Sequence, residues 1–181
     1  MKNLLIICVV VLVSCKTSKP VNSVITASET IFVQSENCPE NGNCVLELIP
    51  NKTITFKKDE FGNLYPVISE GSKTLFKYTF TKNPISETED SNYTEIVYAE
   101  LNLNEDLKLQ NEALKNIKMH YGRLCFCKGE SGYFPIERGV FNLTKMEGDL
   151  VKIDVDFIMK KIPQLVSEIH ETVSLKSNTT N

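Results

Sequence analysis

The feature that most constrains the fold is the alternation of apolar and polar side chains in short runs. Every second residue from 151 to 159 is apolar, and Lys152, Asp154 and Asp156 lie between them. A period of two places alternate side chains on opposite faces of a β-strand. We therefore expect an amphipathic strand here, and residues 74–80 and 94–103 alternate in the same way.

Turn-forming residues divide the chain into about ten short runs, a spacing that is typical of all-β domains. Asn41-Gly42 and the glycine-containing segment 128–132 are examples of such turns. The sequence therefore predicts an antiparallel β-sandwich or barrel. Residues 133–136 and 139–145 are expected to pair with each other as a hairpin.

Two segments fit the strand period less clearly. Residues 105–116 are rich in Glu, Leu, Lys, Gln and Ala, which favours one short helix or a loop. Residues 165–175 are compatible with either a helical or an extended period. The β-branched Thr172 and Val173 favour a strand, so we predict a final strand there.

The amino terminus has the pattern of a secretory signal. Lys2 precedes a uniformly apolar run at residues 4–13, which is shorter than the roughly 20 residues that a spanning helix needs. The run ends in Leu12-Val13-Ser14-Cys15, which resembles the lipobox of bacterial lipoproteins. This resemblance implies cleavage before Cys15, diacylation of its thiol and acylation of the new amino terminus. Acyl chains such as palmitate contribute about 0.8 kcal/mol per buried methylene, which makes such an anchor permanent.

The resemblance also implies a location. Lys16 stands where an Asp retains some lipoproteins in the inner membrane, and no acidic run follows Cys15 to favour export to the cell surface. We therefore expect an outer-membrane lipoprotein on the periplasmic side. The rest of the chain resembles lipoproteins of Bacteroidetes-type bacteria in general character, without a motif that defines a family. The expected organisation is a signal peptide at 1–14, lipidated Cys15 and a flexible tether at 15–30, one β-rich domain at 31–175 and a polar tail at 176–181.

Four cysteines follow the amino-terminal region, and an even number outside the cytoplasm favours disulfides. They are Cys38, Cys44, Cys125 and Cys127. In an extended strand the Cα atoms of Cys125 and Cys127 would lie about 6.6 Å apart, at the long end of disulfide geometry. We therefore favour two crossed bridges between the pairs over local closure of Cys38 on Cys44. A metal site formed by all four thiolates is the weaker alternative, because the spacings differ from those of zinc knuckles.

Composition and spacing argue against several functions. The chain has 20 basic and 23 acidic residues without a basic run, so nucleic acid is not an expected partner. His120 and His170 are isolated in the sequence and lack metal-site spacing, and no Gly-x-Ser-x-Gly motif occurs. Asp154 and Asp156 share a strand face, and the acidic segment 87–90 is polar. Both are interpreted as solvated.

The expected function is therefore a non-enzymatic binding or structural module, with no catalytic residue, metal or cofactor beyond the lipid on Cys15. Its partners would be the membrane, through the lipid, and an envelope protein or glycan. Tyr121, Tyr133 and Phe134 are a candidate sugar-stacking face, although core packing also explains them. The alternative is a carbohydrate-binding module or a carboxylate-based glycan hydrolase, which requires two carboxyl groups about 5–9.5 Å apart in a cleft.

Overall fold

The structure, a computed structural model, describes residues 29–84 and 91–176 as two antiparallel sheets and one short helix. This confirms the predicted all-β fold. The larger sheet contains β1 (Ile31–Gln34), β2 (Gly42–Lys58), β3 (Leu64–Glu70), β4 (Lys73–Lys82), β5 (Tyr93–Leu101), β7 (His120–Cys125) and β8 (Gly132–Pro135). The smaller sheet contains β6 (Leu107–Gln110), β9 (Gly139–Met146), β10 (Leu150–Phe157) and β11 (Glu168–Ser174).

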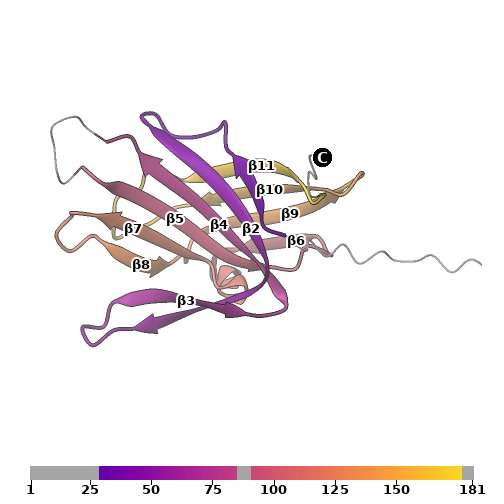
Figure 1. Cartoon of the computed structure of the whole chain (residues 1–181). Coiled ribbons are helices and arrows are strands. Elements are labelled where there is room, and N and C mark those ends of the chain that lie inside the picture. Colours follow the sequence, from indigo (N-terminus) through magenta and orange to yellow (C-terminus); the bar gives the residue numbers. More distant parts are fainter. Residues whose placement is uncertain (1–28, 85–90, 177–181) are drawn as a thin grey trace, which may run out of the picture.

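The main core lies between the two sheets, and Figure 1 shows the smaller sheet behind the larger one. Alternation decides which side chains enter it: Val151, Ile153 and Val155 of β10 are buried. The two sheets meet through aromatic contacts such as that between Phe76 and Phe141, whose rings pack edge to face at 5.6 Å. Burial of such rings is the main source of stability for a sandwich of this kind.

The long strand β2 curves the larger sheet. Its first half, from Gly42 to Ile49, pairs with β4, whereas its second half, from Lys52 to Lys58, pairs with β3. The register shifts between Ile49 and Lys52, where Asn51 has a positive φ of 56°. As a result the β2–β3 hairpin diverges from the other strands and extends below β8 (Figure 1). A second, smaller core beneath it contains Ile54, Leu75, Ile96 and Tyr98.

Two charged side chains hold β2 just beyond the bend. The Ile54 N–H donates to Glu100 Oε1 at 2.6 Å, and Lys118 Nζ donates to the Ile54 carbonyl at 2.8 Å. Lys118 and Glu100 also form an ion pair at 2.7 Å. Burial alone would raise the pKa of Glu100, but the hydrogen bonds from Lys118, Thr53 and Ile54 outweigh it, so the pKa lies below its usual value. These contacts satisfy backbone groups that have lost their β4 partner.

The structure resolves the two segments, 105–116 and 165–175, whose secondary structure was ambiguous in the sequence. The predicted final strand is confirmed by β11. The composition of 105–116 favoured helix or loop, yet this part of the chain holds the short strand β6 followed by the 3-10 helix η1 (Asn111–Ile117). Among the described residues, no helix is long and apolar enough to cross a bilayer.

The expected hairpin of residues 133–136 and 139–145 is wrong. β8 pairs with β7 and β3 in the larger sheet, and β9 pairs with β10 and β6 in the smaller one. The chain crosses between the sheets immediately before Gly139, which has a φ of 150°. A Cβ at Gly139 would lie 2.2 Å from the Asp156 carbonyl oxygen and 2.8 Å from Phe157 Cα. Glycine is thus required where β9 enters the smaller sheet against β10.

We predict that Gly139→Ala lowers the free energy of unfolding by about 2–4 kcal/mol, because the methyl group overlaps backbone atoms and the φ is unfavourable. Gly148→Ala is the matched control: its φ of 77° is also positive, but no atom lies within 4 Å of the added Cβ. The free energy of unfolding of this control should fall by about 1–2 kcal/mol. Urea denaturation measures both, and equal losses would contradict the steric explanation.

Candidate functional site

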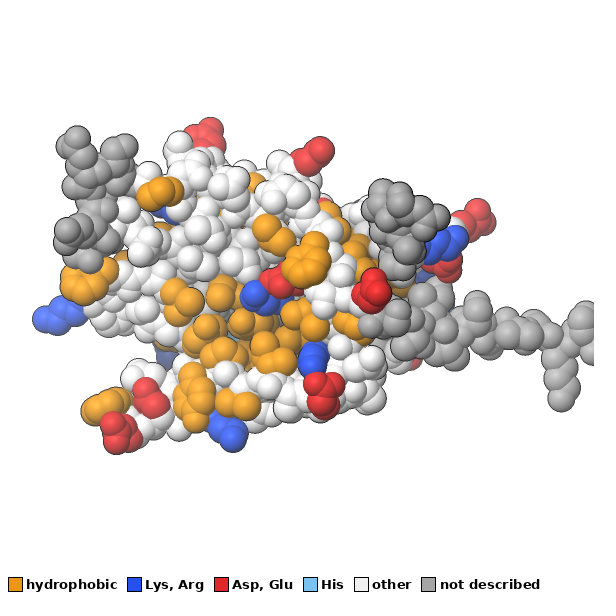
Figure 2. Space-filling view, in the orientation of Figure 1, with side chains coloured by type: hydrophobic (Ala, Val, Ile, Leu, Met, Phe, Trp, Pro, Cys, Tyr) orange, Lys and Arg blue, Asp and Glu red, His pale blue; other side chains and the backbone are white. Residues whose placement is uncertain are grey.

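A cavity of about 330 Å³ opens between the β2–β3 turn and the β7–β8 connection. It exists because β3 and β8 pair at one position, Leu64 with Tyr133, and diverge elsewhere. Its lining residues include the aromatic Tyr133 and Phe134 and the polar Lys58, Asn63 and Ser131. Phe134 also packs against the main core, whereas Tyr133 packs against the small one. In Figure 2 hydrophobic side chains gather along this side of the molecule, and the surface is hollowed beside the β2–β3 hairpin. We call this cavity the hollow.

Tyr133 forms the boundary between the hollow and the small core. It lies over Gly122 of β7, where an added Cβ would be 2.6 Å from its ring. Its ring centroid is 6.3 Å from that of Tyr98 and 6.1 Å from that of Phe56. Burial, with smaller contributions from Tyr133 and Glu47, raises the pKa of Tyr98 to about 12. Burial also raises the pKa of Tyr133, so both hydroxyls remain protonated near neutral pH.

His120 packs within this aromatic group, and its contacts indicate a structural role. Its ring stacks on Phe56 with centroids 3.6 Å apart. Nδ1 lies 2.9 Å from the Lys118 carbonyl, which fixes Nδ1 as the donor. Burial lowers the pKa of His120, despite the opposing effect of this hydrogen bond. The imidazole is therefore neutral near pH 7 and is held by its neighbours.

Two exposed phenylalanines flank the hollow. Phe61 in the β2–β3 turn is 81% exposed, and Phe126 beyond β7 is 86% exposed. Neither has a role in the core, so both are available for contact with another molecule. Phe61 lies between Glu60 and Gly62 in a segment of turn-forming residues, which is a sequence sign of exposure. Phe126 lies at the end of a strand-like run and was not distinguishable from a core phenylalanine by sequence alone.

The crossed disulfides favoured by the sequence are wrong. Cys38 pairs with Cys44 and Cys125 pairs with Cys127. A bridge between Cys125 and Cys127 was not favoured because we expected an extended backbone between them. In the structure β7 ends at Cys125 and the chain bends at Phe126. The Cα atoms of this pair are consequently 5.2 Å apart. All four sulfurs lie in disulfides, so none is a thiolate for the alternative metal site. Cys15 lies outside the described residues.

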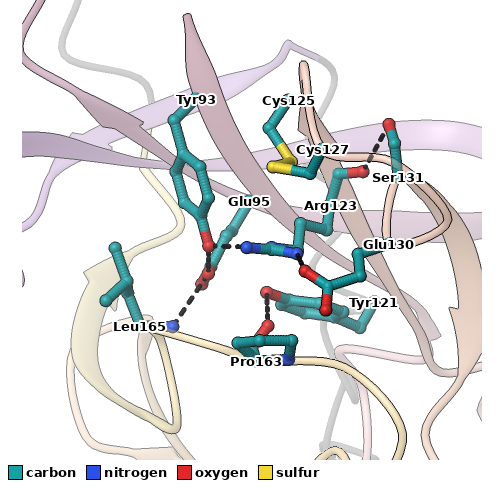
Figure 3. Close-up of polar contacts among 10 residues, drawn as sticks. All are labelled: Tyr93, Glu95, Tyr121, Arg123, Cys125, Cys127, Glu130, Ser131, Pro163 and Leu165. Atoms are coloured by element: carbon teal, nitrogen blue, oxygen red, sulfur yellow. Dashed lines mark hydrogen bonds and ion pairs between the residues drawn. A yellow bond between two sulfur atoms is a disulfide. The ribbon is translucent and has the colours of Figure 1, made fainter. Parts of the chain in front are cut away.

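A buried polar network joins the larger sheet to the segment between β10 and β11 (Figure 3). The Glu95 carboxylate is 1% exposed and accepts hydrogen bonds from the backbone N–H groups of Leu165 and Val166, at 2.8 and 2.7 Å. It also accepts a hydrogen bond from the Tyr93 hydroxyl. Arg123 Nε donates to the same hydroxyl at 3.2 Å. Glu95 therefore fixes the β10–β11 segment against the larger sheet.

Tyr121 belongs to this network and not to a sugar-stacking face. It is fully buried between the sheets, and its hydroxyl lies 3.5 Å from the Pro163 carbonyl. Burial and then the charge of Glu95 raise its pKa well above the usual value. Of the three aromatic residues proposed for a sugar-stacking face, Tyr133 and Phe134 remain partly exposed and line the hollow. Adjacent residues of a strand face opposite sides, which separates Tyr121 from the outer-face positions of β7.

The outer face of the smaller sheet carries the predicted aspartates. Asp154 contacts Lys152 at 2.9 Å and His170 Nδ1 at 3.0 Å. Burial alone would raise the pKa of Asp154, but these two partners outweigh it and the pKa is lowered. Asp156 lies opposite Glu168 on β11. His170, which looked isolated in the sequence, is thus beside carboxylates supplied by two strands. The acidic segment 87–90 falls outside the described residues.

Comparison of the chain with protein-family models, with curated proteins and with solved structures finds no match. The function is therefore inferred from the geometry of these residues.

We predict that Glu95→Gln lowers the free energy of unfolding by about 2–4 kcal/mol, because the amide offers one acceptor where the carboxylate offers two to buried donors. Glu130→Gln is the control in the same network, since Glu130 pairs with Arg123 but is 45% exposed. It should cost less than about 1 kcal/mol. Chemical denaturation compares them, and a similar cost for both would show that Glu95 has no special structural role.

Proposed function

We propose that this chain is a lipid-anchored module of the bacterial outer membrane that binds an envelope glycan in the hollow and does not cleave it. The observation that carries the proposal is the hollow itself, a cavity of about 330 Å³ with aromatic and hydrogen-bonding walls. Sugars present apolar ring faces and hydroxyl edges. A site for them therefore combines a partly exposed aromatic ring with polar side chains.

Tyr133 meets both requirements. Its ring is partly exposed in the wall of the hollow, and within the described part of the chain its hydroxyl makes no hydrogen bond. Asn63 and Ser131 supply amide and hydroxyl groups nearby, and Lys58 supplies a positive charge. This combination supports a polar ligand with apolar faces over a purely apolar one.

The lining of the hollow favours binding over hydrolysis. A glycosidase of the usual kind needs two carboxyl groups that face each other across the cleft. The described residues that line the hollow include no Asp or Glu. A second cavity of about 120 Å³, beside Phe134 and Pro135, has the single carboxylate Glu137 among its described lining residues.

The anchor is supported by the sequence pattern that ends at Cys15, and Lys16 favours the outer membrane. A tether leading from the lipid would join the domain at β1. Figure 1 shows β1 beginning toward the opposite end of the molecule from the β2–β3 turn and the β7–β8 connection. With this attachment the hollow would be directed away from the lipid, toward the periplasm and its glycans.

We predict that Tyr133→Ala weakens glycan binding about tenfold, because it removes the stacking ring. Tyr65→Ala is the matched control: Tyr65 lies on β3 and is 42% exposed, but it does not line the hollow. The probes are purified peptidoglycan fragments and lipopolysaccharide oligosaccharides, with binding followed by calorimetry. Absence of binding by the unmodified chain, or equal losses in both variants, would reject the glycan proposal.

We predict that Cys15→Ala abolishes incorporation of an alkyne-palmitate label, because the acylated thiol is lost. Cys8→Ala is the control, since Cys8 lies within the apolar run of the signal and should leave labelling unchanged. In-gel detection after growth with the label measures both. Labelling that persists in Cys15→Ala would reject the lipid anchor without bearing on the hollow.

A further inference from the structure

Three side chains of types that can bind a metal lie together on the outer face of the smaller sheet. The hollow, in contrast, is lined by residues of the larger sheet and its loops. Asp156 comes from β10, and Glu168 and His170 come from β11. One ligand atom from each of the three lies within 4.8 Å of the other two. All three side chains are exposed, so they can rotate to bring these atoms closer. The strand register fixes the arrangement, because it pairs Asp156 with Glu168 and Asp154 with His170.

His170 is already oriented for coordination. Its Nδ1 lies 3.0 Å from Asp154 Oδ1, so Nδ1 carries the proton and Nε2 keeps its lone pair. Nε2 lies 3.8 Å from Glu168 Oε2. The second oxygen of Asp154 is occupied by Lys152 at 2.9 Å. A histidine that ligates a metal through one nitrogen usually donates its other N–H to a carboxylate in this way.

The carboxylates of Asp156 and Glu168 lie opposite each other on neighbouring strands, and a bound cation would reduce the repulsion between them. Like charges directly opposite each other on neighbouring strands destabilise a sheet. Among the described residues, no lysine or arginine forms an ion pair with either carboxylate. The nearest described partner of Glu168 is the imidazole of His170, which bears a charge only when it is protonated.

The surface beside the three ligands has room for the rest of a coordination shell. A shallow cavity of about 270 Å³ is lined by Asp156 and Glu168, together with Ser167 and Val140. Water can therefore complete the coordination of an ion held by three protein atoms. One imidazole and two carboxylates suit Zn²⁺, whereas Ca²⁺ and Mg²⁺ prefer oxygen ligands alone.

We propose that Asp156, Glu168 and His170 form a surface binding site for a divalent transition-metal ion, with Zn²⁺ as the best fit. Asp154 is a positioning residue, which acts by holding the His170 ring. The site joins β10 to β11, the edge strand of the smaller sheet. It leaves open coordination positions that face solvent and are accessible to a ligand from another molecule.

The test is a calorimetric titration of Zn²⁺ into the full mature chain in detergent, with any purification tag removed. We expect one ion per chain. His170→Gln and the double change Asp156→Asn with Glu168→Gln should each abolish this binding. Asp154→Asn should weaken it about 10- to 100-fold, the usual effect of removing the carboxylate behind a ligating histidine. Mg²⁺ at the same concentration should not bind.

His120→Gln is the matched control, because His120 is the other histidine of the chain and stacks on Phe56 in the larger sheet. It should leave zinc affinity unchanged. Melting temperatures measured with a chelator present separate folding from coordination, because His170→Gln should then melt like the unmodified chain. Added Zn²⁺ should raise the melting temperature of the unmodified chain but not that of His170→Gln. Failure of the unmodified chain to bind millimolar Zn²⁺, or binding that survives in His170→Gln, would overturn the proposal.

Discussion

The shape of this protein depends on how one strand, β2, divides its hydrogen bonds between two neighbours. Because β2 leaves β4 and continues with β3, its backbone needs other partners at the bend. Glu100 and Lys118 supply them to the N–H and the carbonyl of Ile54. Apolar burial alone is non-directional and does not select this curvature. The charged pair therefore determines where the β2–β3 hairpin lies, and the hairpin in turn forms one wall of the hollow.

A second polar cluster, around Glu95, fixes the position of one sheet relative to the other. Glu95 holds the backbone N–H groups of Leu165 and Val166, in the segment that leads into β11. Buried carboxylates are costly unless every lone pair is used, so such a group specifies one arrangement more strongly than an apolar contact does. In this fold the packed rings supply the stability, and Glu95 and Glu100 fix how the strands are placed. The candidate sites depend on that placement.

Alternation in the sequence was sufficient to predict the fold class and most strands, including β10, whereas β11 was predicted from the β-branched Thr172 and Val173 because its period was ambiguous. Periodicity does not reveal which sheet a strand joins, and so β8 and β9 were wrongly paired with each other. It also does not reveal where a strand ends. The bend at Phe126 brings the Cα atoms of Cys125 and Cys127 to 5.2 Å, a distance that the assumption of an extended strand could not give. The candidate sites were hidden for the same reason, because His170 meets Asp154 only through the register of β10 with β11.

The hollow arises from missing backbone pairing, and this explains why residue types gave so little sign of it. Strands β3 and β8 share one pairing, and the glycines Gly62 and Gly129 place no side chains in the space between their loops. Two sheet edges that diverge normally invite further strands or collapse. Pro66 in β3 has no backbone N–H, which disfavours the addition of another strand there. The Tyr133 ring covers Gly122, so a side chain and not a further strand borders the gap on that side. A cavity maintained in this way accepts a compact ligand more readily than an extended peptide, which is the physical reason for favouring a glycan over a protein strand as its occupant.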